Sequence, residues 1–115
     1  MVNFPEITQI QTLDEKVELS LFLDPSIAYF EGHFPGLPIL PGVAQLHWAV
    51  ELGKQYLGLP DTGVTSVEVL KFSHILQPGD EVRLTFEKKS PQKFVFSYTS
   101  EKGSHASGRI VLSDV

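Results

Sequence analysis

The sequence predicts an α+β fold in which an antiparallel sheet of about five or six strands wraps around one long central helix. Three observations carry this prediction: one segment with helical apolar spacing, several segments in which apolar and polar residues alternate, and short turns between most of those segments. Short turns join antiparallel neighbours. A small sheet around a single helix buries the apolar surface of both kinds of element.

Five segments are predicted as strands. In residues 16–23, Val17, Leu19 and Leu21 stand at alternate positions, which is the two-residue period of a strand. Residues 64–70 form the next strand, and residues 81–89, 93–100 and 105–113 follow one another with little between them. The turns at 77–80 and 90–92 contain proline, and the first also contains glycine, which favours reversal of the chain.

The helix is predicted over residues 43–57. Its apolar residues cover most of the circumference, so we expect it to be buried on most sides. Gly58 and Pro60 end it. The preceding loop, residues 29–42, is dense in glycine and proline, which free or fix backbone angles and give the loop a defined path.

Composition and charge exclude several classes of protein. The 115 residues are enough for one domain, which we expect to cover residues 1–115. A net charge of −5 disfavours binding to nucleic acid, and the absence of cysteine excludes disulfides, cysteine-based zinc or iron–sulfur sites and a cysteine nucleophile. The four histidines lack metal-ligand spacing, so no metal is expected. Without a membrane-spanning run or an export signal, we expect a cytoplasmic protein with no membrane partner.

The loop before the helix carries the candidate chemistry. His33 stands at its start, where a rigid backbone holds the imidazole in place, as a general base requires. The free N–H groups at the helix start, near Gly42 and Val43, can polarise a carbonyl oxygen, and His47 lies one turn further on. These are the parts needed to remove a proton α to a thioester. The alternatives are a loop-capping or core role for His33 and a backbone hydrogen bond for His47.

The same segment resembles the signature of the β-hydroxyacyl-acyl-carrier-protein dehydratases, which have the hot-dog fold. The matching residues are His33-Phe34-Pro35-Gly36, Pro38 and Pro41-Gly42, with Lys71-Phe72 and Gln77-Pro78-Gly79-Asp80 matching a second motif. The start of the helix also looks like that of the small dehydratase-like proteins of aryl polyene biosynthesis. The resemblance implies a single hot-dog domain over residues 1–115.

The resemblance also implies roles for individual residues. His33 would remove the C2 proton of a 3-hydroxyacyl thioester, the Gly42 N–H would hold the thioester carbonyl, and the carbonyl oxygen of Ile39 would orient the imidazole. The product would be the trans-2-enoyl thioester. No cofactor is expected, because the thioester and the amide-lined carbonyl site make C2 acidic. The substrate would be carried by an acidic acyl carrier protein, for which Lys71 is the matching basic position.

Two positions depart from the family pattern. Leu37 stands where the family has a polar residue, and His47 stands where the family has a Glu or Asp, fourteen positions after the first histidine. In the family this second residue comes from the partner subunit, so we expect a homodimer or a heterodimer with another hot-dog subunit. Burial favours the protonated form of a carboxylic acid but the neutral form of histidine. We expect His47 still to handle the departing hydroxyl, either as imidazolium or by holding a water. Glu51, four residues further on, is a candidate partner that would keep His47 protonated, and the alternative for Glu51 is a solvated or interface residue.

Two other functions stay open at this point. A non-catalytic or partner-dependent hot-dog subunit is favoured by the missing carboxylate and disfavoured by the retained His33. An acyl thioesterase ranks lower, because such enzymes use a carboxylate near the helix start and this helix has none before Glu51.

Overall fold

The computed structural model describes residues 3–30 and 38–113 of the chain. Its strands are β1 (Glu6–Leu13), β2 (Lys16–Phe22), β3 (Val64–Phe72), β4 (Glu81–Ser90), β5 (Lys93–Ser100) and β6 (Gly103–Leu112). The α-helix is α1 (Gly42–Leu57), and a short 3-10 helix, η1, spans Ala28–Phe30.

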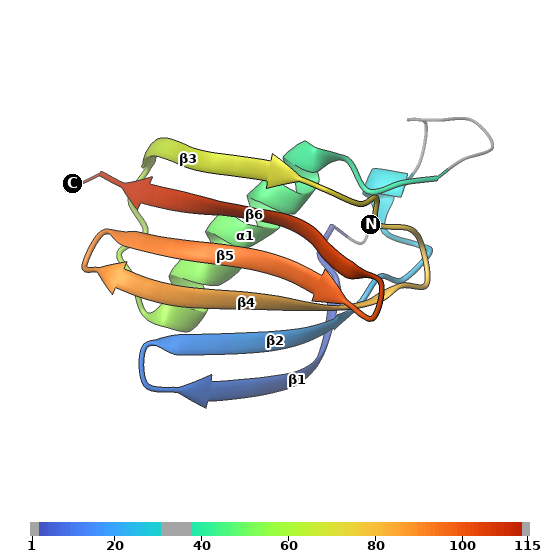
Figure 1. Cartoon of the computed structure of the whole chain (residues 1–115), viewed down its shortest axis with the longest axis horizontal. Coiled ribbons are helices and arrows are strands. Elements are labelled where there is room, and N and C mark those ends of the chain that lie inside the picture. The colour runs from blue at the N-terminus through green and yellow to red at the C-terminus, as the bar shows by residue number, and fades with distance from the viewer. Residues whose placement is uncertain (1–2, 31–37, 114–115) are drawn as a thin grey trace.

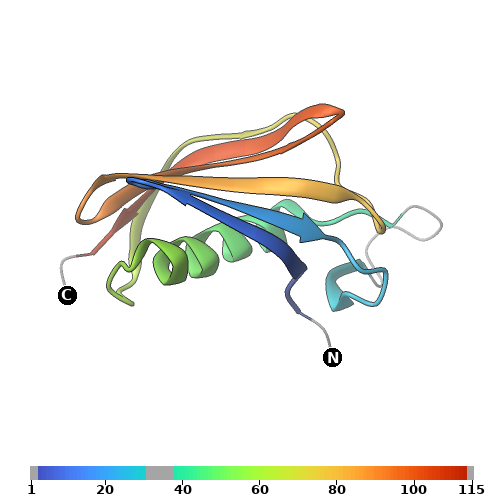
Figure 2. The ribbon, with the colours of Figure 1, turned by 90° about the horizontal axis from the view of Figure 1, so that it is seen from below.

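The strands form one sheet in the order β1-β2-β4-β5-β6-β3, and every neighbouring pair is antiparallel. Strands β1 and β3 are its edges. Figure 1 shows α1 running across one face of this sheet, and Figure 2 shows the sheet curving over the helix. The predicted α+β fold, with one antiparallel sheet around one helix, is confirmed.

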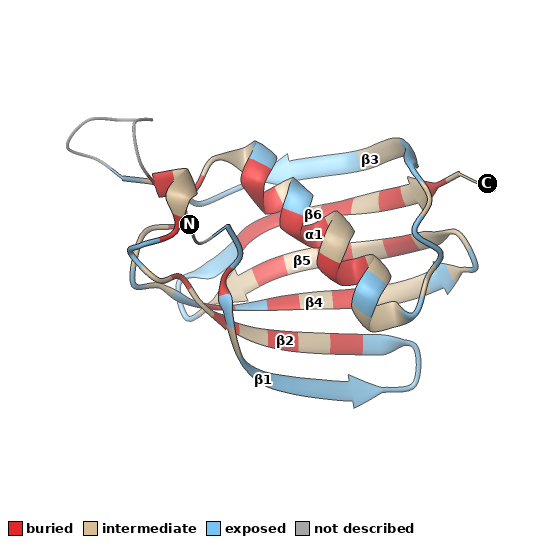
Figure 3. Cartoon of the chain, turned by 180° about the vertical axis from the view of Figure 1, so that it is seen from behind, coloured by how far each residue is buried: buried red, intermediate tan, exposed pale blue. Residues whose placement is uncertain are grey.

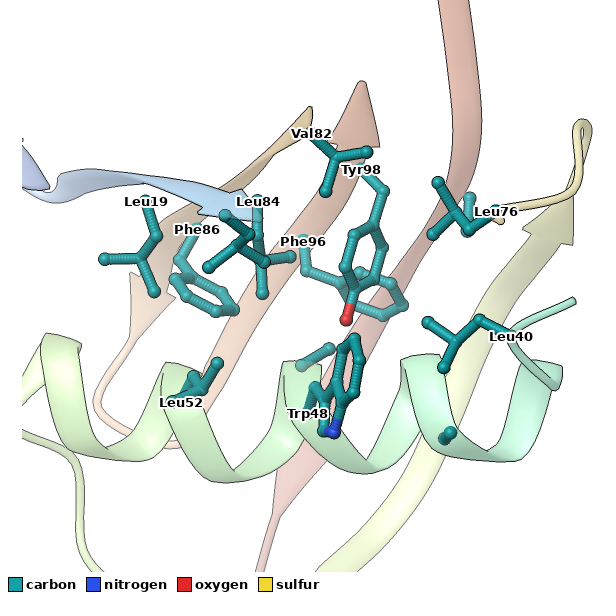
Figure 4. Close-up of a cluster of buried hydrophobic side chains, with 14 of the residues drawn as sticks. Leu19, Leu40, Trp48, Leu52, Leu76, Val82, Leu84, Phe86, Phe96 and Tyr98 are labelled. Carbon is teal, nitrogen blue, oxygen red and sulfur yellow. The ribbon is translucent and has the colours of Figure 1, made fainter. Parts of the chain in front are cut away.

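The core lies between α1 and the four inner strands. Alternate residues of β2, β4 and β5 are buried against the helix, as the two-residue period requires. Figure 4 shows Leu84, Phe86 and Tyr98 reaching from the sheet toward Trp48 and Leu52 of α1. These side chains are almost completely inaccessible to solvent, so the sheet fixes both the direction of α1 and the place of its N-terminus.

Gly53 allows α1 to lie close to β5. A Cβ atom built on Gly53 would lie 2.4 Å from Cε2 of Phe94 and 3.2 Å from Cε1 of Phe86. Real Cβ atoms do not approach rings so closely, so the spacing between helix and sheet depends on the missing side chain.

Strand β1 was not predicted. Its residues are exposed apart from one half-buried position, because β1 is an edge strand and α1 does not cover it. The register of β1 against β2 also shifts between Ile7 and Gln9. A strand with little burial on either face has no apolar period, so the pattern that predicted the inner strands is absent from it.

One face of α1 is open. The buried residues of the helix face the sheet, whereas Val43 is 77% exposed and His47 and Gln55 are also exposed. Figure 3 shows this outward side of the helix and the two exposed edges of the sheet. The expectation that α1 is buried on most sides is therefore wrong for the chain by itself, because several apolar residues of the helix are covered only in part.

No helix in residues 3–30 and 38–113 is long and apolar enough to cross a membrane.

Candidate active site

The N-terminus of α1 presents two free amide groups. The helix begins at Gly42, one residue before the predicted start, and Pro41 stands at the N-cap in an extended conformation with no side chain capping the helix. Among the described residues, no acceptor is bonded to the N–H of Gly42 or Val43. Two donors that no described residue pairs, at the positive end of a helix dipole, can bind a partial negative charge.

The loop carbonyl at Ile39 has a fixed direction. Its peptide group also contains the N–H of Leu40, which donates to the carbonyl oxygen of Leu76 over 2.8 Å. Because a trans peptide is planar, the Ile39 carbonyl points to the opposite side from the Leu76 oxygen. The predicted orienting group is therefore part of a rigid backbone.

His33 and Leu37 lie outside the described residues. The predicted role of His33 as the base stays a prediction.

His47 lies on the open face of α1, one turn after Val43. Its ring is next to Phe4, with 5.5 Å between the ring centroids. The segment that carries Phe4 is tied to the helix, because Nε1 of Trp48 donates to the Asn3 carbonyl oxygen over 2.8 Å. His47 is not buried in the single chain, contrary to expectation, but it is held by a neighbouring aromatic ring that sequence reasoning missed.

Glu51 forms an ion pair with Lys54 and not with His47 among the described residues. Its carboxylate pairs with the Lys54 ammonium at 3.2 Å, and the described residues contain no ion pair between Glu51 and His47. The Lys54 ammonium also donates to Asp61 over 2.7 Å, and this bond raises the pKa of Lys54. The expected support of His47 by Glu51 is therefore wrong in the single chain.

The described end of the first motif, at Gly42, lies beside the second motif. The Phe72 ring at the end of β3 packs against Gly42, where a Cβ atom would lie 3.0 Å from Cζ of the ring. Lys71, which precedes Phe72, is exposed, and no described carboxylate pairs with its ammonium. The aromatic ring of Phe72 thus borders the helix start, and the exposed Lys71 precedes it in β3.

A buried histidine supports the segment that holds Leu40. His105 Nδ1 lies 3.1 Å from the Ile75 carbonyl oxygen, and Nε2 lies 2.6 Å from Oγ of Ser100. A carbonyl oxygen only accepts, so Nδ1 of His105 donates to it, and Nε2 shares a hydrogen bond with the Ser100 hydroxyl. This bond fixes the chain next to Leu76, whose carbonyl oxygen holds the Leu40 N–H.

Other sites are less suited to an acyl thioester. A hollow of about 640 Å³ lies at one end of β1, β2 and β4, but it takes no residue from α1 and its lining includes Glu81, Arg83 and Lys102. Within the described residues, no group of His, Asp and Glu side chains could hold a metal ion.

The fold and the helix entrance define a hot-dog protein with dehydratase motifs. The chain belongs to the ApeI-like family, described as ApeI dehydratase, whose model matches residues 9–109. This agrees with the family indicated by the loop and helix motifs.

Curated relatives match part of their own length. The 3-hydroxyacyl-[acyl-carrier-protein] dehydratase FabZ of Novosphingobium aromaticivorans is 30% identical over an alignment of 96 residues, which covers 75% of this chain and 61% of that protein. FabZ of Latilactobacillus sakei is 41% identical over an alignment of 69 residues, which covers 53% of this chain and 49% of that protein. The chain thus spans less than two thirds of the length of either relative.

Solved structures match over nearly the whole chain. A chain of the dehydratase heterocomplex ApeI:P from Xenorhabdus doucetiae has a TM-score of 0.85 and 31% identity, covering 95% of this chain and 97% of that one. The dehydratase domain of the polyketide PpsC from Mycobacterium tuberculosis has a TM-score of 0.74 and 17% identity, covering 97% of this chain and 45% of that one. The second likeness shows the fold alone.

Proposed function

We propose that this chain dehydrates a 3-hydroxyacyl thioester on an acyl carrier protein to the trans-2-enoyl thioester. The observation that carries the proposal is the pair of free amides at Gly42 and Val43, next to the pinned carbonyl of Ile39. Membership of the ApeI dehydratase family supports the reaction class, and the FabZ names of the relatives support the carrier-bound substrate. We expect it to act in the cytoplasm, in fatty acid or aryl polyene biosynthesis.

The proposed mechanism moves two protons and breaks one C–O bond. The His33 imidazole takes the proton from C2, and the charge that develops on the thioester oxygen is held by the Gly42 and Val43 amides. The electron pair then forms the C2–C3 double bond as the C3–O bond breaks. The leaving hydroxyl takes a proton from His47 and departs as water. A positioned base contributes about 100- to 10,000-fold to such a step.

The proposed site needs a second subunit. His47 lies on the open face of α1, where the chain itself does not cover it. Strand β3 has no strand partner on its outer side among the described residues. Exposed apolar residues of β3 and of the segment that follows it form the β3 patch, made of Val69, Leu70, Phe72 and Ile75. Exposed apolar residues on a free edge are typical of an interface. A homodimer or a heterodimer with another hot-dog subunit fits this surface, and a related structure is a heterocomplex.

Assembly through the β3 patch is tested by light scattering after size-exclusion chromatography. Leu70→Lys should shift the protein toward a smaller species. Leu13→Lys, at an exposed apolar site on the opposite edge strand, is the control and should leave assembly unchanged. Equal behaviour of the two variants would place the interface elsewhere.

The role of His47 is tested by mass-spectrometric dehydration assays on a 3-hydroxyacyl carrier protein. His47→Ala should lower turnover by roughly 100-fold or more, because the hydroxyl would leave without its acid. His47→Glu should keep or raise activity, because it restores the family's carboxylic acid. Gln55→Ala, at another exposed position of α1, should behave as wild type. Wild-type turnover in His47→Ala would remove His47 from the mechanism.

Docking of the carrier is assigned to Lys71. Acyl carrier proteins are acidic, and Lys71 is an exposed cation that no described carboxylate pairs, one residue before the Phe72 ring that packs on Gly42. Lys71→Glu should raise KM for the carrier-bound substrate far more than for a short thioester mimic. Lys89→Glu makes the same charge change at the far end of β4 and should alter neither. An equal loss on both substrates would argue against docking at Lys71.

A partner-dependent subunit is the second candidate function. The replacement of the carboxylate by His47 favours it, and so does the heterocomplex named for a similar structure. In that case the chain alone would give no turnover, and activity would appear when a second hot-dog subunit is added. A thioesterase fits less well, since the first carboxylate of α1, Glu51, is paired with Lys54.

A further inference from the structure

Three successive peptide groups lead into α1, and each is held by a hydrogen bond. Leu40 N–H donates to the Leu76 carbonyl oxygen over 2.8 Å. The Leu40 carbonyl oxygen accepts from Nε2 of Gln45 over 3.1 Å. The Pro41 carbonyl oxygen accepts from the N–H of Ala44 at 3.1 Å and of Gln45 at 3.2 Å. The third of these peptide groups contains the Gly42 N–H, which points away from the Pro41 carbonyl and out of the helix.

Gln45 holds two of the three groups, one through its side chain and one through its backbone. Its own carbonyl oxygen accepts from the Tyr98 hydroxyl over 2.6 Å, so the same residue is tied to β5. Burial raises the pKa of Tyr98 well above its ordinary value of 10.0, and the hydroxyl therefore stays a donor. Gln45 thus connects the loop, the start of α1 and the sheet.

The Gln45 side chain is in an unfavourable place for an amide. It is 4% exposed, and its Oε1 is buried without a hydrogen-bond partner among the described residues. A buried acceptor without a donor destabilises a protein, and an apolar side chain of the same size would avoid that cost. What the amide provides is a donor for the Leu40 carbonyl oxygen.

The bond to Leu40 also leaves the helix amides free. A common N-cap side chain, such as serine or aspartate, accepts from the first N–H groups of a helix and occupies them. Pro41 has no such oxygen, and Gln45 instead fixes the entrance from its carbonyl side. The backbone is therefore rigid at the point where Gly42 and Val43 N–H stay available to a ligand.

We propose that Gln45 is a positioning residue, which holds the Leu40–Pro41 backbone so that the Gly42 N–H points at the thioester carbonyl. This inference rests on the proposed function for the identity of the ligand. Gln45 would touch no reacting atom and would act through the backbone at the start of α1.

The test compares Gln45→Met with wild type. Methionine has a similar size but donates no hydrogen bond. We expect kcat to fall about 10- to 100-fold on both carrier-bound and short thioesters, with KM little changed, because a misplaced amide weakens the transition state rather than docking. The urea midpoint should stay close to that of wild type, since removal of the unpaired Oε1 offsets the loss of the donor to the buried Leu40 carbonyl oxygen. Gln55→Met on the exposed face is the matched control.

Gln45→Glu adds a pH readout. A glutamate carboxylate cannot donate to the Leu40 carbonyl oxygen, whereas the protonated acid can. The activity of this variant relative to wild type should therefore rise as the pH falls. If Gln45 had a purely structural role, the relative activity of Gln45→Glu would not rise at low pH as long as the stability of the variant stayed the same.

Backbone NMR relaxation separates this inference from the proposed function. In Gln45→Met, the order parameters of the Gly42 and Val43 amides should fall from a rigid value of about 0.85 toward the flexible range below about 0.6. This result is expected whether or not the protein dehydrates the substrates tried. Unchanged order parameters, or a kcat within about twofold of an active wild type, would overturn the assignment of Gln45.

Discussion

Gly53→Ala tests the packing that places the helix entrance. In the interior of a helix, alanine is ordinarily about 1 kcal/mol more favourable than glycine. Here the added Cβ atom would lie 2.4 Å from Cε2 and 2.6 Å from Cζ of Phe94. Carbon atoms pack at about 3.5–4.0 Å, so the ring or the helix must move by about 1 Å. Phe94 is fully buried and packs edge-on against Phe86, which leaves the ring no free space.

The net effect follows from these two opposing terms. Overpacking a core costs about 1–3 kcal/mol, and two buried rings place Gly53→Ala at the upper end. After subtracting the gain in helix propensity, we expect a loss of about 2 kcal/mol in the free energy of unfolding. A urea m-value of about 2 kcal/mol/M converts this into a midpoint lower by about 1 M.

Gly63→Ala is the control, because nothing lies within 4 Å of a Cβ atom at Gly63 and no positive φ is involved. It should leave the urea midpoint close to that of wild type. A Gly53→Ala midpoint equal to or above wild type would refute the close approach of α1 to β5. The hydroxyl of Tyr98 on β5 donates to the Gln45 carbonyl oxygen on α1. If Gly53→Ala moves α1 away from β5, this hydrogen bond near the start of the helix should also weaken.

Two further perturbations address smaller contacts. Phe4→Ala removes the ring beside His47 and should lower kcat roughly 2- to 10-fold, as measured by turnover. Light scattering should show unchanged assembly. An unaltered kcat would show that the ring does not position His47. The bond from Lys54 holds the pKa of the Asp61 carboxyl below its ordinary value of 3.8. A lowered folded-state pKa adds stability above the ordinary value, and this contribution is lost as the pH falls through the folded-state value. Asp61→Asn should therefore lower the urea midpoint slightly at pH 7, and the difference should vanish below pH 3.8; a difference that persists in acid would contradict the ion pair.

The inner part of the fold could be predicted from sequence, and its edge could not. Strands β2, β4, β5 and β6 bury alternate residues, so their apolar period is visible in the sequence. Strand β1 is exposed except at Ile7, and no apolar period marks it. Apolar spacing also failed to separate the covered and open faces of α1, because residues such as Val43 are apolar yet exposed in the single chain.

The candidate site also has a part that could be predicted from the sequence and a part that could not. The Gly/Pro motif and the spacing to His47 are properties of the sequence, and the structure shows Gly42 and Val43 at the start of α1, whereas the roles of these residues stay predictions. The contacts of Gln45 and Phe4 arise from the tertiary structure. The only signal for Gln45 was a polar residue among apolar neighbours in a helix, which alone does not indicate what it holds.

The most direct test is the mass-spectrometric dehydration assay with wild type and His33→Ala, on protein whose dimer has been verified. Wild type should convert the 3-hydroxyacyl carrier protein to the enoyl form with loss of one water. His33→Ala should lower this rate by about 100- to 10,000-fold while the dimer stays intact. Equal turnover by the two proteins would contradict the mechanism. No wild-type turnover on short, long and aryl polyene substrates would instead favour a subunit that needs a different partner.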